Sequence, residues 1–104
     1  MRITLTALMI LVVPAYAGDD HAAIRSGRTF VEKNCSPCHA VGSTGESPHP
    51  DAPAFRSLST RYPLVNLEES LAEGILTGHP DMPEFKVQPK DISDIIRYLN
   101  SIQK

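Results

Sequence analysis

The sequence predicts an all-α domain with three to four main helices. Residues 89–102 carry apolar side chains at positions 92, 95, 96, 99 and 102, which follow one face of a helix. Residues 66–77 repeat an apolar side chain every four positions, again as a helix does. No stretch shows a convincing strand pattern, and the sequence contains no internal repeat.

The first 17 residues are predicted to be a secretory signal peptide that is cleaved after Ala17. Arg2 supplies the positive start, residues 3–13 form an apolar run, and residues 15–17 (A-Y-A) form a small-x-small cleavage site. The run is shorter than the roughly 18 residues that span a bilayer, so no stable membrane span is expected after cleavage. Residues 18–104 are predicted to form one domain, located in the periplasm.

The predicted mature chain is small and slightly acidic. Without Arg2 it has 9 basic and 12 acidic residues, a formal charge of −3. A nucleic-acid partner is not expected, because phosphate binding requires a basic patch. A domain of this size buries only about 60% of its unfolded surface and usually needs an additional stabilising element, such as a disulfide or a bound cofactor. The only two cysteines belong to one motif, so no separate disulfide is available. A covalently held cofactor can provide the stabilisation instead.

Residues 19–34 are predicted to form the first helix. Asp19 or Asp20 is expected to cap its N-terminus, where carboxylates are favoured. Gly27 lies inside this helix, although an interior glycine costs about 1 kcal/mol relative to alanine. Close approach of another helix would account for the glycine.

Residues 40–63 form a loop-rich stretch punctuated by glycine and proline, in which only residues 54–60 favour a short helix. A connection of this length in a small domain is expected to have a function, such as wrapping one face and one edge of a cofactor.

Two further helices complete the prediction. Residues 66–77 form one, with Asn66 and Glu69 resembling a capping box and Gly78 expected as a left-handed C-terminal cap. The last helix begins with Pro89 at its first position and ends at about Ile102.

The segment C-S-P-C-H at residues 35–39 carries the chemistry. Cys35 and Cys38 can each add a thiol across one of the two vinyl groups of haem. His39 directly after them can then supply an axial nitrogen to the iron. This spacing indicates attachment of one c-type haem.

Other interpretations of the cysteine pair fit less well. A thioredoxin-like redox pair needs a βαβ context, and the sequence shows almost no strand signal. A structural zinc site needs four ligands, and there is no second cysteine pair. A disulfide between the two cysteines would give His39 no role.

A second axial ligand can come from Met82, His21, His49 or His79. Met82 is the only methionine that remains after the predicted cleavage, and it lies between turn-promoting glycine and proline residues. An isolated methionine is often core filler, but a proline-flanked loop is an unusual place for that role.

The sequence resembles the class I cytochromes c, of the small bacterial periplasmic kind, over nearly the whole predicted mature chain. The residues that carry the resemblance are Gly27, Phe30 and Val31, C-S-P-C-H-A-V-G at 35–42, A-P-A-F at 52–55, G-H-P-D-M-P-E-F at 78–85, and Tyr98 with Leu99. The resemblance implies a class I cytochrome c-like fold, wrapped around one haem c attached through Cys35 and Cys38.

The resemblance also implies roles for individual residues. The first and last helices should cross, with Tyr98 or Leu99 opposite Gly27. The Pro53 carbonyl should accept a hydrogen bond from His39, and Met82 should be the distal iron ligand. Arg61 and Tyr62 are candidates for contact with a haem propionate, although Arg61 is equally well explained as an ordinary surface residue. The lysine-rich rim of many mitochondrial members is not evident, since only Lys33, Lys86, Lys90 and Lys104 are present.

The predicted function is transfer of single electrons between redox protein partners, with no catalytic residues of its own. The chain would be a diffusible carrier or the cytochrome subunit of a dehydrogenase, as a monomer or as a small subunit. Its partners would be a dehydrogenase, a cytochrome complex, or a terminal oxidase or reductase. The alternative is a gas-binding or peroxidase-like haem protein with an open distal site, in which His79 or Asp81 would act on protons.

Overall fold

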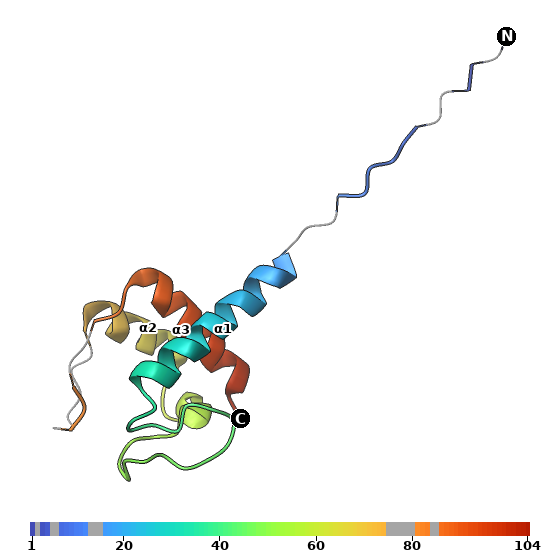
Figure 1. Cartoon of the computed structure of the whole chain (residues 1–104). Coiled ribbons are helices and arrows are strands. Elements are labelled where there is room, and N and C mark those ends of the chain that lie inside the picture. Colours follow the sequence, from blue (N-terminus) through green and yellow to red (C-terminus); the bar gives the residue numbers. More distant parts are fainter. Residues whose placement is uncertain (2, 5–6, 13–15, 75–80, 84–85) are drawn as a thin grey trace.

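The computed structural model describes residues 1, 3–4, 7–12, 16–74, 81–83 and 86–104, and for residues 16–19 it describes the backbone only. Within these residues the elements are α1 (Tyr16–Asn34), the 3₁₀ helix η1 (Phe55–Thr60), α2 (Leu64–Glu73) and α3 (Pro89–Ile102) (Figure 1). No strand occurs in the described part of the chain, and the predicted all-α class is confirmed.

The described residues before α1 have no regular secondary structure and extend away from the helical domain (Figure 1). Their apolar side chains are exposed, with Leu8 at 88% and Met9 at 90%. This part of the predicted signal peptide therefore contributes nothing to the core.

Helix α1 begins three residues earlier than predicted, at Tyr16, and ends at Asn34 as predicted. Asp19 and Asp20 lie inside the helix, so the expected N-terminal capping by either residue is wrong. The helix can start earlier because Tyr16 and Ala17 are not proline, the residue that most strongly breaks a helix.

Helices α1 and α3 cross at Gly27 (Figure 1). A Cβ atom at Gly27 would lie 2.1 Å from the backbone oxygen of Asp94 and 2.9 Å from the Cβ of Tyr98. Only a residue without a side chain lets the two backbones approach this closely. The expected crossing of the first and last helices, with Tyr98 opposite Gly27, is confirmed.

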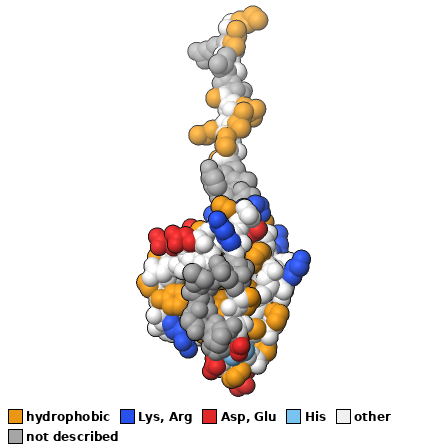
Figure 2. Space-filling view, turned by 90° about the vertical axis from the view of Figure 1, so that its left-hand side faces the viewer, with side chains coloured by type: hydrophobic (Ala, Val, Ile, Leu, Met, Phe, Trp, Pro, Cys, Tyr) orange, Lys and Arg blue, Asp and Glu red, His pale blue; other side chains and the backbone are white. Residues whose placement is uncertain are grey.

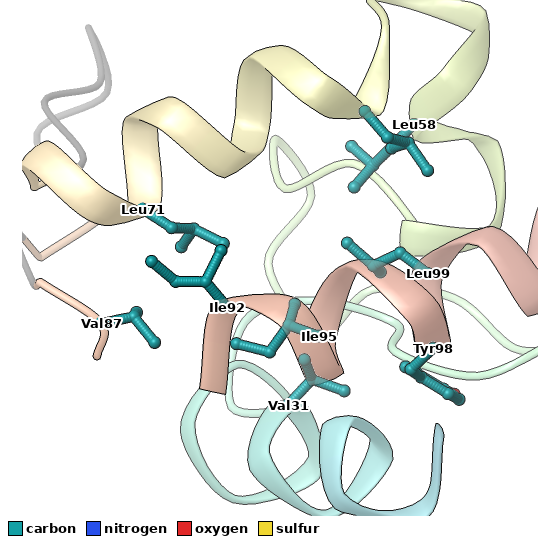
Figure 3. Packing of buried hydrophobic residues seen from close by; sticks show 9 residues of the cluster. Val31, Leu58, Leu71, Val87, Ile92, Ile95, Tyr98 and Leu99 are labelled. Carbon is teal, nitrogen blue, oxygen red and sulfur yellow. The ribbon is translucent and has the colours of Figure 1, made fainter. Parts of the chain in front are cut away.

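The core lies where the three α-helices meet. Figure 3 shows Leu71 of α2 next to Ile92 of α3, and Val31 of α1 next to Ile95 of α3. Val31 and Leu99 are each only 1% exposed. Helix α3 has the bounds that were predicted for it, Pro89–Ile102, and it supplies the largest share of the buried side chains.

Helix α2 differs from its prediction at both ends. It begins at Leu64 and ends at Glu73, so Asn66 is its third residue and the expected capping box is wrong. Starting at Leu64 buries that side chain on the same face as Leu71, which outweighs the contribution of a side-chain cap. The helix ends before Gly74, whose φ is +101°, and Gly78, the cap predicted from the sequence, lies outside the described residues.

Hydrogen bonds fasten the long loop after α1 to η1 and to the C-terminal part of the chain. The backbone N–H of Phe55 donates to the Ala40 carbonyl at 2.9 Å. The Tyr98 hydroxyl of α3 donates to the Val41 carbonyl at 2.6 Å, and the Gln103 amide donates to the Phe55 carbonyl at 2.7 Å. The loop is therefore held in one path along the cavity described next, and its short helix falls at 55–60, where 54–60 was predicted.

Candidate functional site

An apolar cavity of about 440 Å³ lies between the helices and the loop that follows α1. Its apolar lining residues come from all three α-helices, from η1 and from the loop: Phe30, Val31, Pro53, Phe55, Leu58, Leu67, Leu71, Ile95 and Leu99. A largely apolar cavity with a few polar groups suits a large, mostly hydrophobic cofactor.

The two cysteines and His39 line this cavity together. A tight turn directly after α1 brings them there, in which the N–H groups of Cys38 and His39 donate to the Cys35 carbonyl at 3.2 and 2.9 Å. The Cys35 N–H in turn donates to the Val31 carbonyl at 2.9 Å, which anchors the turn to the helix. The three reactive side chains are thereby presented to one space.

The Cys35 thiol is held in its neutral form. Burial among apolar groups raises the pKa of Cys35 to about 11, because it disfavours the charged thiolate. Thioredoxin-like cysteines and metal-binding cysteines work as thiolates and have lowered pKa values. The apolar environment of Cys35 is compatible with a side chain that joins an apolar cofactor.

The His39 ring is fixed in one tautomer. Its Nδ1 lies 2.8 Å from the Pro53 carbonyl oxygen, which can only accept, so Nδ1 carries the proton and donates. The other nitrogen, Nε2, is left with a lone pair that can bind a metal. The ring also lies against Phe55, with centroids 4.8 Å apart. The hydrogen bond to Pro53 implied by the resemblance is confirmed.

Met82 also lines the cavity and is partly buried against the core. Among the rival axial ligands, His49 lines the cavity, whereas His21 is exposed on α1 and is not among the lining residues. His79 lies outside the described residues. The described geometry thus brings Met82 and His49 into the same cavity as His39.

Tyr62 lines the cavity, but Arg61 does not. Burial raises the pKa of the Tyr62 hydroxyl, so this group stays protonated and able to donate a hydrogen bond. Of the two residues considered for a propionate contact, Tyr62 is the one placed at the cavity wall.

Sequence reasoning missed one pairing at the site. His49 was considered only as an iron ligand, and Asp81 only as a proton-transfer group, yet His49 Nε2 lies 3.0 Å from Asp81 Oδ2. The two residues are 32 positions apart, so no local sequence pattern predicts this contact.

Comparison with protein families matches residues 22–99 to the family described as cytochrome c oxidase, cbb3-type, subunit III. The chain belongs to this family of c-type cytochromes. The cytochrome therefore carries covalently bound haem c, which supplies one-electron chemistry at its iron. It is an electron carrier that works with redox partners.

Two relatives agree with this assignment. The cytochrome is 29% identical over 98 residues to cytochrome c-552 of Bradyrhizobium diazoefficiens, an alignment that covers 90% of this chain and 92% of the relative. It is 25% identical over 76 residues to a cytochrome c-553-like protein of Synechocystis, covering 73% of this chain and 66% of the relative. No solved structure gave a significant match.

The residues at the cavity fit a haem c. Two cysteines at the attachment spacing, a histidine whose Nε2 is available and an apolar enclosure are the groups that such a cofactor requires. The resemblance found in the sequence is therefore confirmed at the level of the family.

Proposed function

We propose that the cytochrome is an exported one-electron carrier in which Cys35 and Cys38 hold the haem while His39 and Met82 bind its iron. The observation that carries the proposal is the convergence of these four side chains on one apolar cavity, with His39 already oriented by Pro53. Filling both axial positions leaves no site for a substrate, which is the requirement of a carrier rather than of a haem enzyme.

The two axial residues have different tasks. The hydrogen bond from Nδ1 to the Pro53 carbonyl keeps the His39 ring in one orientation, so Nε2 need not reorganise when the charge of the iron changes. Met82 brings a soft thioether, which favours the reduced metal and raises the reduction potential. Apolar walls such as Leu71 and Leu99 exclude water and limit solvent rearrangement.

An optical comparison of the purified wild-type protein tests the proposal. We expect the reduced protein to show a c-type spectrum that stays unchanged at carbon monoxide concentrations that saturate haem proteins with an open iron, because Met82 occupies the sixth position. The haem should also resist extraction by acid, because thioether bonds hold it. Ready binding of carbon monoxide would instead support a gas-binding or peroxidase-like protein.

The proposal also includes the redox partners from which the cytochrome accepts electrons and to which it passes them. The relative named cytochrome c-552 supports a small carrier, while the family description names an oxidase subunit, which makes a terminal oxidase a candidate acceptor. A dehydrogenase or a cytochrome complex is the candidate donor. Acidic and basic side chains both occur on the face shown in Figure 2, which does not favour a partner of one strong charge.

Export to the periplasm is supported by the predicted signal peptide. The described apolar side chains before α1 are exposed and pack on no part of the core. Among the described residues, none of the helices has both the length and the hydropathy needed to cross a bilayer. The exposed apolar run agrees with a signal peptide that is removed after it has directed the chain across the membrane.

The mass of the mature protein is a direct prediction. Periplasmic material should start at Gly18 and carry the mass of one haem, because two thioether bonds form without loss of atoms from either partner. Intact-mass spectrometry measures both quantities at once. A mass equal to the bare polypeptide, or one that still includes residues 1–17, would contradict the assignment of the leader or of the cofactor.

A further inference from the structure

We propose that His49 is a positioning residue, which holds the segment of Met82 in place through Asp81. This inference rests on the proposed ligation of iron by Met82 and adds a residue outside the attachment motif to that site. Its basis is a set of hydrogen bonds that joins the two segments bearing the axial ligands.

His49 is fastened to the segment that carries the haem-binding motif. Its backbone N–H donates to the Cys38 carbonyl at 3.1 Å, and its own carbonyl accepts from the Ala52 N–H at 3.2 Å. The N–H of Asp51 donates to Nδ1 of the ring at 3.1 Å. These bonds fix both the backbone and the ring of His49 next to the motif.

The same bonds determine where the ring proton lies. Because Nδ1 accepts from the Asp51 N–H, the neutral ring carries its proton on Nε2. Nε2 can then donate to Asp81 Oδ2, 3.0 Å away. The His49 side chain is 24% exposed and the Asp81 side chain is 65% exposed, so the ring end of this bond is shielded from water while the carboxylate end is open to it.

Asp81 transmits this restraint to Met82, its neighbour in the chain. Consecutive Cα atoms are about 3.8 Å apart, so a restraint on Asp81 also limits where the Met82 backbone can lie. A methionine side chain has three rotatable bonds and does not specify its own position well. Restraining its backbone therefore narrows the positions that the thioether can take relative to His39.

The substitutions His49→Gln and His49→Asn test the two hydrogen bonds of the His49 ring one at a time. His49→Gln places an amide N–H near the position of Nε2 and keeps a donor for Asp81. His49→Asn places an amide oxygen near Nδ1, which keeps the acceptor for the Asp51 N–H but removes the donor. Asp81→Ala removes the acceptor from the other side, and the double variant His49→Asn/Asp81→Ala removes both groups.

Two spectroscopic signals of the haem-loaded protein report on the proposal: carbon monoxide binding in the reduced form, and the absorption band of methionine-bound iron in the oxidised form. We expect His49→Asn and Asp81→Ala each to increase the affinity for carbon monoxide about fivefold and to weaken the methionine band. His49→Gln should stay close to the wild type. The double variant should show no larger change than either single variant, because both remove the same interaction.

Met82→Ala, measured in parallel, separates the two proposals. If it opens the iron while His49→Asn and Asp81→Ala leave it closed, the role of His49 is wrong and the ligand assignment stands. If Met82→Ala itself leaves the iron closed, both proposals fail. Equal effects of His49→Gln and His49→Asn, or additive effects in the double variant, would show that the bond to Asp81 is not the cause. Thermal unfolding of each variant identifies any change that comes only from lost stability.

Discussion

Met82→Ala is expected to open the haem iron to carbon monoxide while leaving the haem covalently attached and the helices largely intact. Met82 lines the cavity and is only partly buried, so its loss removes a ligand without removing a central core residue. Losing a thioether ligand should lower the reduction potential, on the order of 100 mV within the about 0.8 V range that axial ligands span. Optical titration with carbon monoxide and redox potentiometry measure the two effects.

His79→Ala is the control for this experiment, because His79 lies only three residues before Met82 in the sequence. We expect it to leave the ligand-field spectrum and the potential unchanged. An iron that opens in His79→Ala but stays closed in Met82→Ala would reverse the assignment of the sixth ligand.

Gly27→Ala is expected to lower the free energy of unfolding by about 2–4 kcal/mol, a large part of what a small domain possesses. The new Cβ would lie 2.1 Å from the Asp94 backbone oxygen and 2.6 Å from its carbonyl carbon, so the helices must separate. Alanine improves helix propensity by only about 1 kcal/mol, which is too little to offset this overlap. Denaturant unfolding of the haem-loaded protein, followed by far-UV circular dichroism, gives the difference.

Gly42→Ala provides a matched control in the same protein. A Cβ atom there would meet nothing within 4 Å, and the residue is not among the glycines with positive φ. Its free energy of unfolding should stay within about 0.5 kcal/mol of the wild type. Similar losses for Gly27→Ala and Gly42→Ala would mean that close packing at the helix crossing is not the reason for the glycine.

The features that the sequence predicts correctly are those with a strong local pattern. Helix α3 is recognisable because its apolar side chains follow one face and Pro89 suits its first turn. The attachment motif is recognisable because the chemistry of two vinyl groups and one iron ligand fixes the spacing of Cys35, Cys38 and His39. Gly27 is informative because glycine inside a helix calls for a tertiary explanation, and the crossing with α3 is that explanation.

The starts of α1 and α2 were predicted less well, because several residues near each start could begin the helix. Asn66 and Asp19 are both suitable caps, yet α2 starts at Leu64 and α1 at Tyr16. In α2 the burial of Leu64 decides the start, and that burial depends on the other helices rather than on the local sequence. Cap preference is therefore a weak guide where a neighbouring apolar residue can reach the core.

Only part of the site could be predicted, because the rest depends on contacts between segments that are far apart in the sequence. The apolar cavity arises from side chains of α1, α2 and α3, whose arrangement follows from the whole fold. The contact between His49 and Asp81 joins two loops, and each residue alone resembles an ordinary polar surface residue. Tyr62 lines the cavity and Arg61 does not, and this difference likewise depends on the path of the chain after η1.

The pairing of α1 with α3 also sets an order of events when the protein is made. Helix α1 ends at Asn34 and α3 begins only at Pro89, so Gly27 cannot meet Asp94 until nearly all of the chain has been synthesised. Cys35 packs against the core cluster that this pairing completes. A chain that emerges with its N-terminus first therefore presents both cysteines in an open form while more than half of its length is still to follow. Haem can therefore be attached in that interval before α1 and α3 have paired.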